Sequence, residues 1–128
     1  MPITQAIAAA AATSFVRDLE TTNAASVASG SAGNVLLVDA DNTANNETTY
    51  LKLYDLAAGS VAFHGSTAGS STNCAMQIKL PSRSRVVVTI DTTDVNFGTA
   101  ISFAALTTGG TLGTTAPSNS TPVSMLPD

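Results

Sequence analysis

The sequence predicts an all-β fold: an antiparallel β-sandwich or a jelly-roll-like barrel of about six to eight short strands, with extended N- and C-terminal segments. Apolar and β-branched residues recur at a period of two, the spacing of a strand that buries one face. Gly, Pro, Asn and Asp residues separate these runs, as turns require. No segment shows the apolar spacing of a packed helix, so we expect the 128 residues to form a single β-domain.

The first twelve residues are expected to form an arm. They include the alanine run from Ala6 to Ala12, which has helix propensity but no amphipathic face to hold a helix against a core. Such a segment either pairs as an edge strand or reaches a neighbouring subunit. It also lacks the cationic start of a signal peptide. We therefore divide the domain into an arm (1–12), a sandwich core (13–108) and an extended C-terminal tail (109–128).

Three strands are expected in the first third of the core. Residues 13–19 alternate weakly between polar and apolar side chains, and residues 23–33 fit a short strand that ends in a glycine turn. Residues 34–40 form a continuous apolar run bounded by turn residues, which predicts a central strand buried on both faces. The Asp/Asn-rich turn at residues 41–46 then leads into the next strand, so we predict a hairpin.

That next strand, residues 47–55, shows the clearest alternation in the chain. One face carries Thr49, Leu51 and Leu53, and the other carries Tyr50, Lys52 and Tyr54. The first face fits a core. The second combines two aromatic rings with polar tips and a lysine, so it suits a partly wet surface or a contact with another chain.

The rest of the chain begins with a long loop, residues 56–73, which is rich in Gly, Ser, Ala and Thr and holds Phe63 and His64. A loop of this length in a compact domain is usually functional, mobile or pinned by a neighbour. Strands follow at 74–80, 85–91 and 101–106. In the first of these, Cys74, Met76, Ile78 and Leu80 share the core face. Prolines 117, 122 and 127 predict an extended tail with one edge strand at 121–125.

Composition excludes several kinds of partner. The net charge is −4 and only 11% of residues are charged, whereas a nucleic-acid surface needs clustered Lys and Arg. The nearest such group, Lys79, Arg83 and Arg85, is interpreted as solvated turn and strand charges. No apolar run approaches the roughly twenty residues of a membrane-spanning helix. We expect no nucleic-acid partner and no membrane partner.

The residues do not predict an enzyme or a cofactor. His64 is the single histidine, and Cys74 points toward the predicted core, so neither a Ser-His-Asp nor a Cys-His pair is expected. Residues from Asp39 onward begin like a calcium loop, but Ala44 and Tyr50 occupy the positions that need Gly and Glu. A different cation site remains open, formed by Asp39 with Asp41 or by Asp91 with Asp94.

The order of segments resembles that of small tailed-phage virion proteins. The resemblance covers residues 34 to about 124: an apolar strand, an Asn/Thr/Ala turn, the Tyr50-Leu-Lys-Leu-Tyr54 run, a Gly-rich loop, a strand that ends at Pro81, and Phe97-Gly-Thr-Ala-Ile101 before a Thr/Gly/Pro end. It implies a β-sandwich structural subunit of a bacteriophage virion, such as a capsid decoration (cement) protein. Such a protein binds the major capsid protein on the capsid surface, is assembled in the host cytoplasm and forms a homo-oligomer, here expected to be a trimer.

Contacts in such an assembly would come from the arm, the 56–73 loop and the tail, with Tyr50, Lys52, Tyr54, Phe63 and His64 as candidate interface residues. Two alternatives have a similar composition. The first is a neck, tail or receptor-binding module of a virion. The second is a carbohydrate-binding sandwich, which needs exposed aromatic residues in one patch, and Tyr50 and Tyr54 are the pair the pattern offers.

Overall fold

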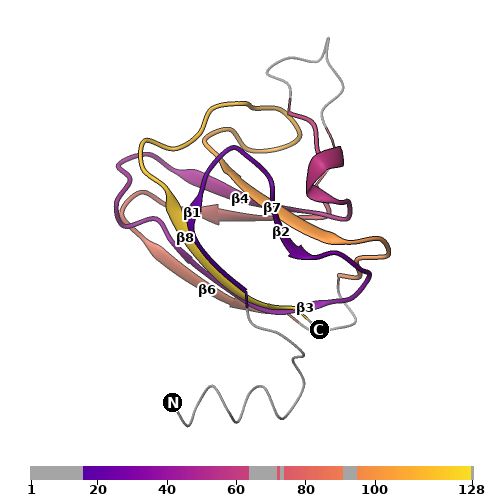
Figure 1. Cartoon of the computed structure of the whole chain (residues 1–128). Helices are drawn as coiled ribbons and strands as arrows, with labels where there is room; N and C mark the ends of the chain where they lie inside the picture. The colour runs from indigo at the N-terminus through magenta and orange to yellow at the C-terminus, as the bar shows by residue number, and fades with distance from the viewer. Residues whose placement is uncertain (1–15, 64–71, 73, 91–94, 128) are drawn as a thin grey trace, which may run out of the picture.

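The computed structural model describes residues 16–63, 72, 74–90 and 95–127, which form eight strands (Figure 1). They are β1 (Val16–Thr21), β2 (Ser26–Ser29), β3 (Val35–Asp41), β4 (Thr49–Tyr54), β5 (Met76–Leu80), β6 (Arg85–Thr89), β7 (Ile101–Leu106) and β8 (Thr121–Pro127). A 3₁₀ turn, η1 (Ala58–Ser60), follows β4. None of the described residues belongs to a helix long and apolar enough to cross a membrane.

The strands form two antiparallel four-stranded sheets in the orders β1-β8-β3-β6 and β2-β7-β4-β5. The pairs are nested along the chain: β1 pairs with β8, β2 with β7, β3 with β6, and β4 with β5. This nesting is the strand order of a double-sheet jelly roll. Figure 1 shows the two sheets as separate layers. The all-β sandwich prediction is therefore confirmed, and the sheets do not close into a barrel.

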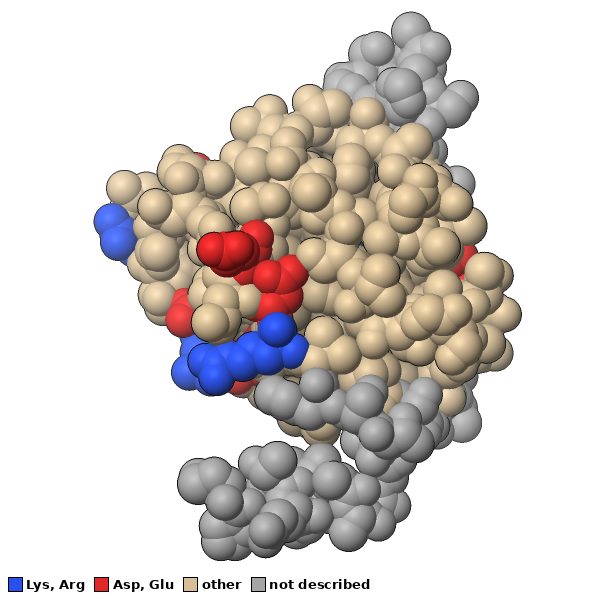
Figure 2. Space-filling view, viewed as in Figure 1, with Lys and Arg blue, Asp and Glu red and all other residues tan. Residues whose placement is uncertain are grey.

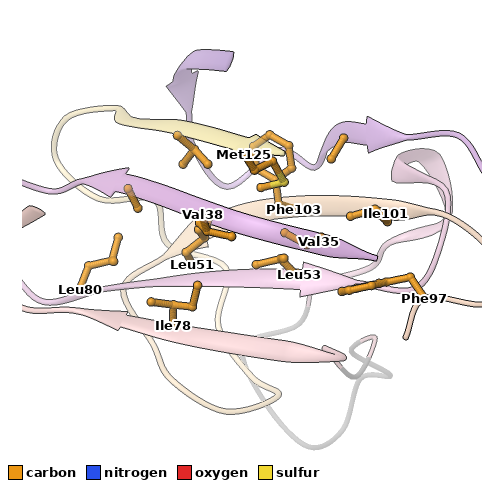
Figure 3. Packing of buried hydrophobic residues seen from close by; sticks show 13 residues of the cluster. Val35, Val38, Leu51, Leu53, Ile78, Leu80, Phe97, Ile101, Phe103 and Met125 are labelled. Carbon is orange, nitrogen blue, oxygen red and sulfur yellow. The ribbon is translucent and has the colours of Figure 1, made fainter. Parts of the chain in front are cut away.

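The core lies between the two sheets and is built from the inward positions of both (Figure 3). Burying one such aliphatic or aromatic side chain contributes about 1.5–3 kcal/mol. The residues labelled in Figure 3 are all buried: Val35, Val38, Leu51, Leu53, Ile78, Leu80, Phe97, Ile101, Phe103 and Met125. The alternation expected for 74–80 is confirmed, because Ile78 and Leu80 are buried, whereas Gln77 and Lys79 are exposed. Cys74, expected on the core face, is half-buried.

The hairpin expected from residues 34–55 is wrong. β3 pairs with β6 and β8 in one sheet, whereas β4 pairs with β5 and β7 in the other, so residues 42–48 cross between the sheets. The expected central position of β3 is confirmed, although alternate residues are only half-buried on its outer face.

A buried asparagine network explains the crossing. Asn42 and Asn45 are fully buried. Asn42 Nδ2 donates to Leu80 O at 3.2 Å and to Glu47 O at 3.1 Å, and Asn45 Nδ2 donates to Asn42 Oδ1 at 2.9 Å. Asn45 Oδ1 also accepts the backbone N–H of Asn119 at 2.7 Å. Asn42 and Asn45 therefore link three connections at one end of the sandwich, those between β3 and β4, β5 and β6, and β7 and β8. They do not form the turn of a hairpin.

The strand expected at 121–125 is confirmed as β8, but its expected edge position in an extended tail is wrong, because β8 lies between β1 and β3 in the middle of a sheet. A proline in a central strand is tolerated at a bulge, where no ladder hydrogen bond is lost. Pro122 lies where the β1–β8 register shifts, and Pro127 lies where the β3–β8 register shifts. The core therefore extends to Pro127. The arm at residues 1–12 lies outside the described residues.

Asp55, directly after β4, fixes the segment that leads into β7. Its carboxylate accepts the backbone N–H groups of Gly98 at 3.0 Å, Thr99 at 2.7 Å and Ala100 at 3.3 Å. These bonds, chiefly the one from Thr99, lower the pKa of Asp55 below its ordinary 3.8. Phe97, at the start of the same segment, is fully buried. The backbone of the Phe97-Gly-Thr-Ala segment therefore binds the side chain of Asp55, which fixes this segment against the end of β4.

We expect acid to destabilise the fold through this carboxylate. A carboxyl group whose pKa is depressed on folding stabilises the native state fully above its unfolded pKa, and this stabilisation is lost as the pH falls through the folded pKa. The pKa values of Asp41 and Glu47 are also lowered, from 3.8 and 4.5. Urea unfolding at several pH values should show the free energy of unfolding falling below about pH 4.5. Asp55→Asn should make that dependence shallower, and an unchanged slope would contradict the assignment.

Candidate functional site

The outer face of β4 is covered, not wet. The expectation of a partly wet face is wrong for Lys52 and Tyr54, which are 1% and 2% exposed, whereas Tyr50 is half-buried. The segment between β7 and β8, residues 107–120, supplies part of the cover.

Lys52 holds that segment in place. Its ammonium Nζ donates to Gly110 O at 2.7 Å and to Leu112 O at 3.0 Å. The backbone N–H of Gly110 in turn donates to Gln77 Oε1 on β5 at 2.9 Å. Burial lowers the pKa of Lys52, because the charged form is partly removed from water. The lysine that the pattern placed at an interface is therefore an internal clamp.

Two glycines fit this segment to the sheet. Gly109 lies against the ring of Tyr50, where an added Cβ would come within 3.0 Å of Tyr50 Cε1. Gly113 has a φ of 120°, and an added Cβ would lie 2.8 Å from Thr108 Cβ. At Gly113 both the backbone conformation and the contact require glycine, whereas at Gly109 a side chain would require the Tyr50 ring to shift by a few tenths of an ångström. The sequence indicated only a Thr/Gly/Pro end here, so the close approach to Tyr50 was missed.

The four candidate interface residues that the structure describes do not form one exposed patch. Tyr54 contacts Phe63 edge to face, with ring centroids 5.9 Å apart and planes at 72°. Phe63 is half-buried, and burial raises the pKa of Tyr54. Tyr50 and Lys52 contact the 107–120 segment instead. His64 lies outside the described residues.

A charged hollow of about 110 Å³ lies on the outer face of the other sheet, lined by Arg17, Asp39, Asp41, Arg85, Pro122 and Ser124. Charged side chains are sparse on the face seen in Figure 2, and several of them gather on one side of it. Arg85 binds the Asp39 carboxylate through two nitrogens, Nε at 2.8 Å and Nη2 at 2.5 Å. Both partners are at least partly exposed, so solvent screens this pair and it contributes little to stability.

The cation site left open at Asp39 and Asp41 is not favoured. The Arg85 guanidinium already neutralises Asp39. One oxygen of Asp41, Oδ1, accepts the Thr43 hydroxyl and the Thr43 N–H, which lowers the pKa of Asp41. Among the described residues no group of three or more His, Cys, Asp or Glu is arranged to hold a metal. Asp91 and Asp94 lie outside the described part of the chain.

The surface feature that the sequence did not single out is aliphatic. Leu19, Val27 and Val87 are 55%, 57% and 57% exposed, and these are the exposed large hydrophobic residues of the described chain. Each belongs to an edge strand: β1, β2 and β6 respectively. The alternation in residues 85–91 could have indicated Val87, since it shares a face with Arg85 and Thr89.

The described surface therefore offers two kinds of feature: a small hollow of paired charges, and sheet edges that carry exposed aliphatic side chains. In the hollow, Arg85 and Asp39 are already paired with each other. The second is suited to contact with another protein chain. Comparison of the chain with protein-family models, with curated proteins and with solved structures gives no match.

Proposed function

We propose that this protein is a structural subunit of a tailed-phage virion, acting as a capsid decoration (cement) protein that binds the major capsid protein and stabilises the head. The observation that carries the proposal is the exposed aliphatic residue on three of the four edge strands. An aliphatic side chain exposed at a sheet edge can pack against another protein chain whether or not the strands pair. A subunit that adheres to a lattice of other subunits needs such edges.

Two further observations support the proposal. The double-sheet jelly roll recurs in viral capsid domains, although it also occurs in lectins, so the fold agrees with the role without specifying it. The resemblance of residues 34–124 to small phage virion proteins points to the same class. In this proposal the Tyr50-Leu-Lys-Leu-Tyr54 run serves the subunit's own packing, and the sheet edges make the contacts.

The carbohydrate-binding alternative is less favoured. Sugar sites in sandwich domains usually present an exposed aromatic ring. Here Tyr54 is buried, and Tyr50 is half-buried against Gly109. A neck, tail or receptor-binding role uses the same kind of surface and differs in its location on the particle, so an experiment must distinguish it.

The test is binding to particles separated by type. Heads without tails, free tails and complete particles of the phage that encodes this chain would be purified on gradients, and the protein sought in each fraction. We expect it to sediment with tail-less heads and to saturate when added to heads that lack it. Recovery with tails alone would indicate the neck or tail role, and recovery with no particle would contradict a virion role.

A further inference from the structure

β6 has an open edge. It pairs with β3 on one side, and among the described residues no strand lies on its other side; Figure 1 shows it at the margin of its sheet. The N–H of Asn42 donates to Ser84 O at 2.8 Å, and the N–H of Ile90 donates to Leu36 O at 3.0 Å. In an antiparallel ladder, residues whose backbone N–H and C=O groups bond to the partner strand alternate with residues whose backbone groups point away from that strand. The backbone N–H and C=O groups of Arg85, Val87 and Thr89 therefore face outward.

The other three edges carry features that discourage pairing, whereas the one charged residue of β6, Arg85, is paired with Asp39. β1 shifts register after Asp18 and carries several charged side chains, and β2 has only four residues and a register shift of its own. β5 exposes Lys79, a charge typical of protected edges. β6 matches β3 through five successive pairs without a shift, and its centre is three valines. Val87, the middle residue, is 57% exposed.

We propose that β6 pairs antiparallel with β6 of a second copy of this chain, around a two-fold axis at Val87. In this register Val87 lies opposite Val87 of the second copy, and Arg85 lies opposite Thr89. No like charges face each other, and each Arg85 is already neutralised by Asp39 of its own chain. The strand is thus complementary to itself, which a two-fold interface requires. The two four-stranded sheets would join into one continuous sheet.

This inference does not rest on the virion role. It predicts a two-fold dimer, whereas the resemblance to virion proteins implies a trimer. The two predictions therefore give oligomers of different mass. A two-fold β6 contact is complete with two copies and leaves no β6 edge for a third.

The first experiment is sedimentation velocity across a wide range of concentrations. We expect the wild type to dimerise reversibly. Val87→Lys should weaken the dimer at least tenfold, because two lysines would then face each other across the axis. Val27→Lys is the matched control, since Val27 is equally exposed on a different edge, and it should leave the dimer unchanged. Circular dichroism would confirm that both variants are folded.

A cross-link tests the register without depending on the lysine variant. Hydrogen-bonded residues that lie opposite in an antiparallel pair have Cα atoms about 5.5 Å apart, which a disulfide can span. In a Cys74→Ser background, oxidation should link Val87→Cys chains into dimers and leave Val27→Cys chains monomeric. A protein that stays monomeric at all concentrations, a trimer, or a dimer lost in Val27→Lys but kept in Val87→Lys would overturn the proposal. So would a monomer whose binding to heads is lost in Val87→Lys, because β6 would then pair with a different protein.

Discussion

Lys52→Ala is expected to lower the free energy of unfolding by about 3 kcal/mol. Each hydrogen bond from a charged group contributes about 1.5–3 kcal/mol, and the Lys52 ammonium makes two, to Gly110 O and Leu112 O. The substitution also removes a side chain that is almost fully buried. Part of the loss is offset because the ammonium no longer has to be desolvated. Urea unfolding monitored by circular dichroism measures the difference.

A second variant separates the contribution of side-chain packing from that of the two hydrogen bonds, and a control variant tests an exposed lysine. Lys52→Met keeps the length of the side chain and removes the ammonium, so it should retain the packing, lose the two hydrogen bonds and fall between the wild type and Lys52→Ala. Lys79→Ala is the control, because Lys79 is exposed on the neighbouring strand directly opposite Tyr50; it should change stability by less than about 0.5 kcal/mol.

The part of the chain that Lys52→Ala loosens is as informative as the size of the stability loss. If Lys52 holds the segment between β7 and β8, amide hydrogen exchange should rise first around Gly110 and Leu112 in Lys52→Ala, before the rest of the sheet is affected. Uniformly faster exchange across β4 and β7, with no preference for this segment, would contradict the clamp.

Lys52 also shows where prediction from the sequence fails. Its alternation with Tyr50 and Tyr54 correctly places all three on one face of β4. Whether that face is wet depends on a segment more than fifty residues later, whose glycines allow it to approach the Tyr50 ring. Alternation reports which residues share a face, and it does not report what covers that face.

The strands themselves were predictable because their signals are local. The apolar positions of β5 and the β-branched run of β6 lie where the period of two places them. The connections were not predictable in this way. Asn42 and Asn45 have the composition of a hairpin turn, and only their buried partners, such as Asn119, show that the chain crosses to the other sheet. Prolines 122 and 127 likewise argued against a central strand until their register shifts were visible.

The crossing leads to the second large effect. Asn45→Ala is expected to lower the free energy of unfolding by about 3 kcal/mol, because Asn45 is fully buried and joins two connections through its side chain. The change would leave the Asn119 N–H and carbonyl and the Asn42 Oδ1 without this partner. A buried polar group that loses its partner costs about 1–3 kcal/mol, and these losses are not fully additive.

Asn46 provides the matched control for Asn45, because it is the next residue and is exposed, with Arg83 Nε donating to its Oδ1 at the surface. Asn46→Ala should cost less than about 1 kcal/mol. Asn45→Asp keeps the shape but turns an oxygen toward two acceptors, Asn42 Oδ1 and Asn119 O, so it should destabilise at least as much as alanine at neutral pH. Equal, small losses for Asn45→Ala and Asn46→Ala would mean that the crossing is held by the sheets alone. A large loss confined to Asn45 would show that a single buried amide stabilises the crossing from one sheet to the other.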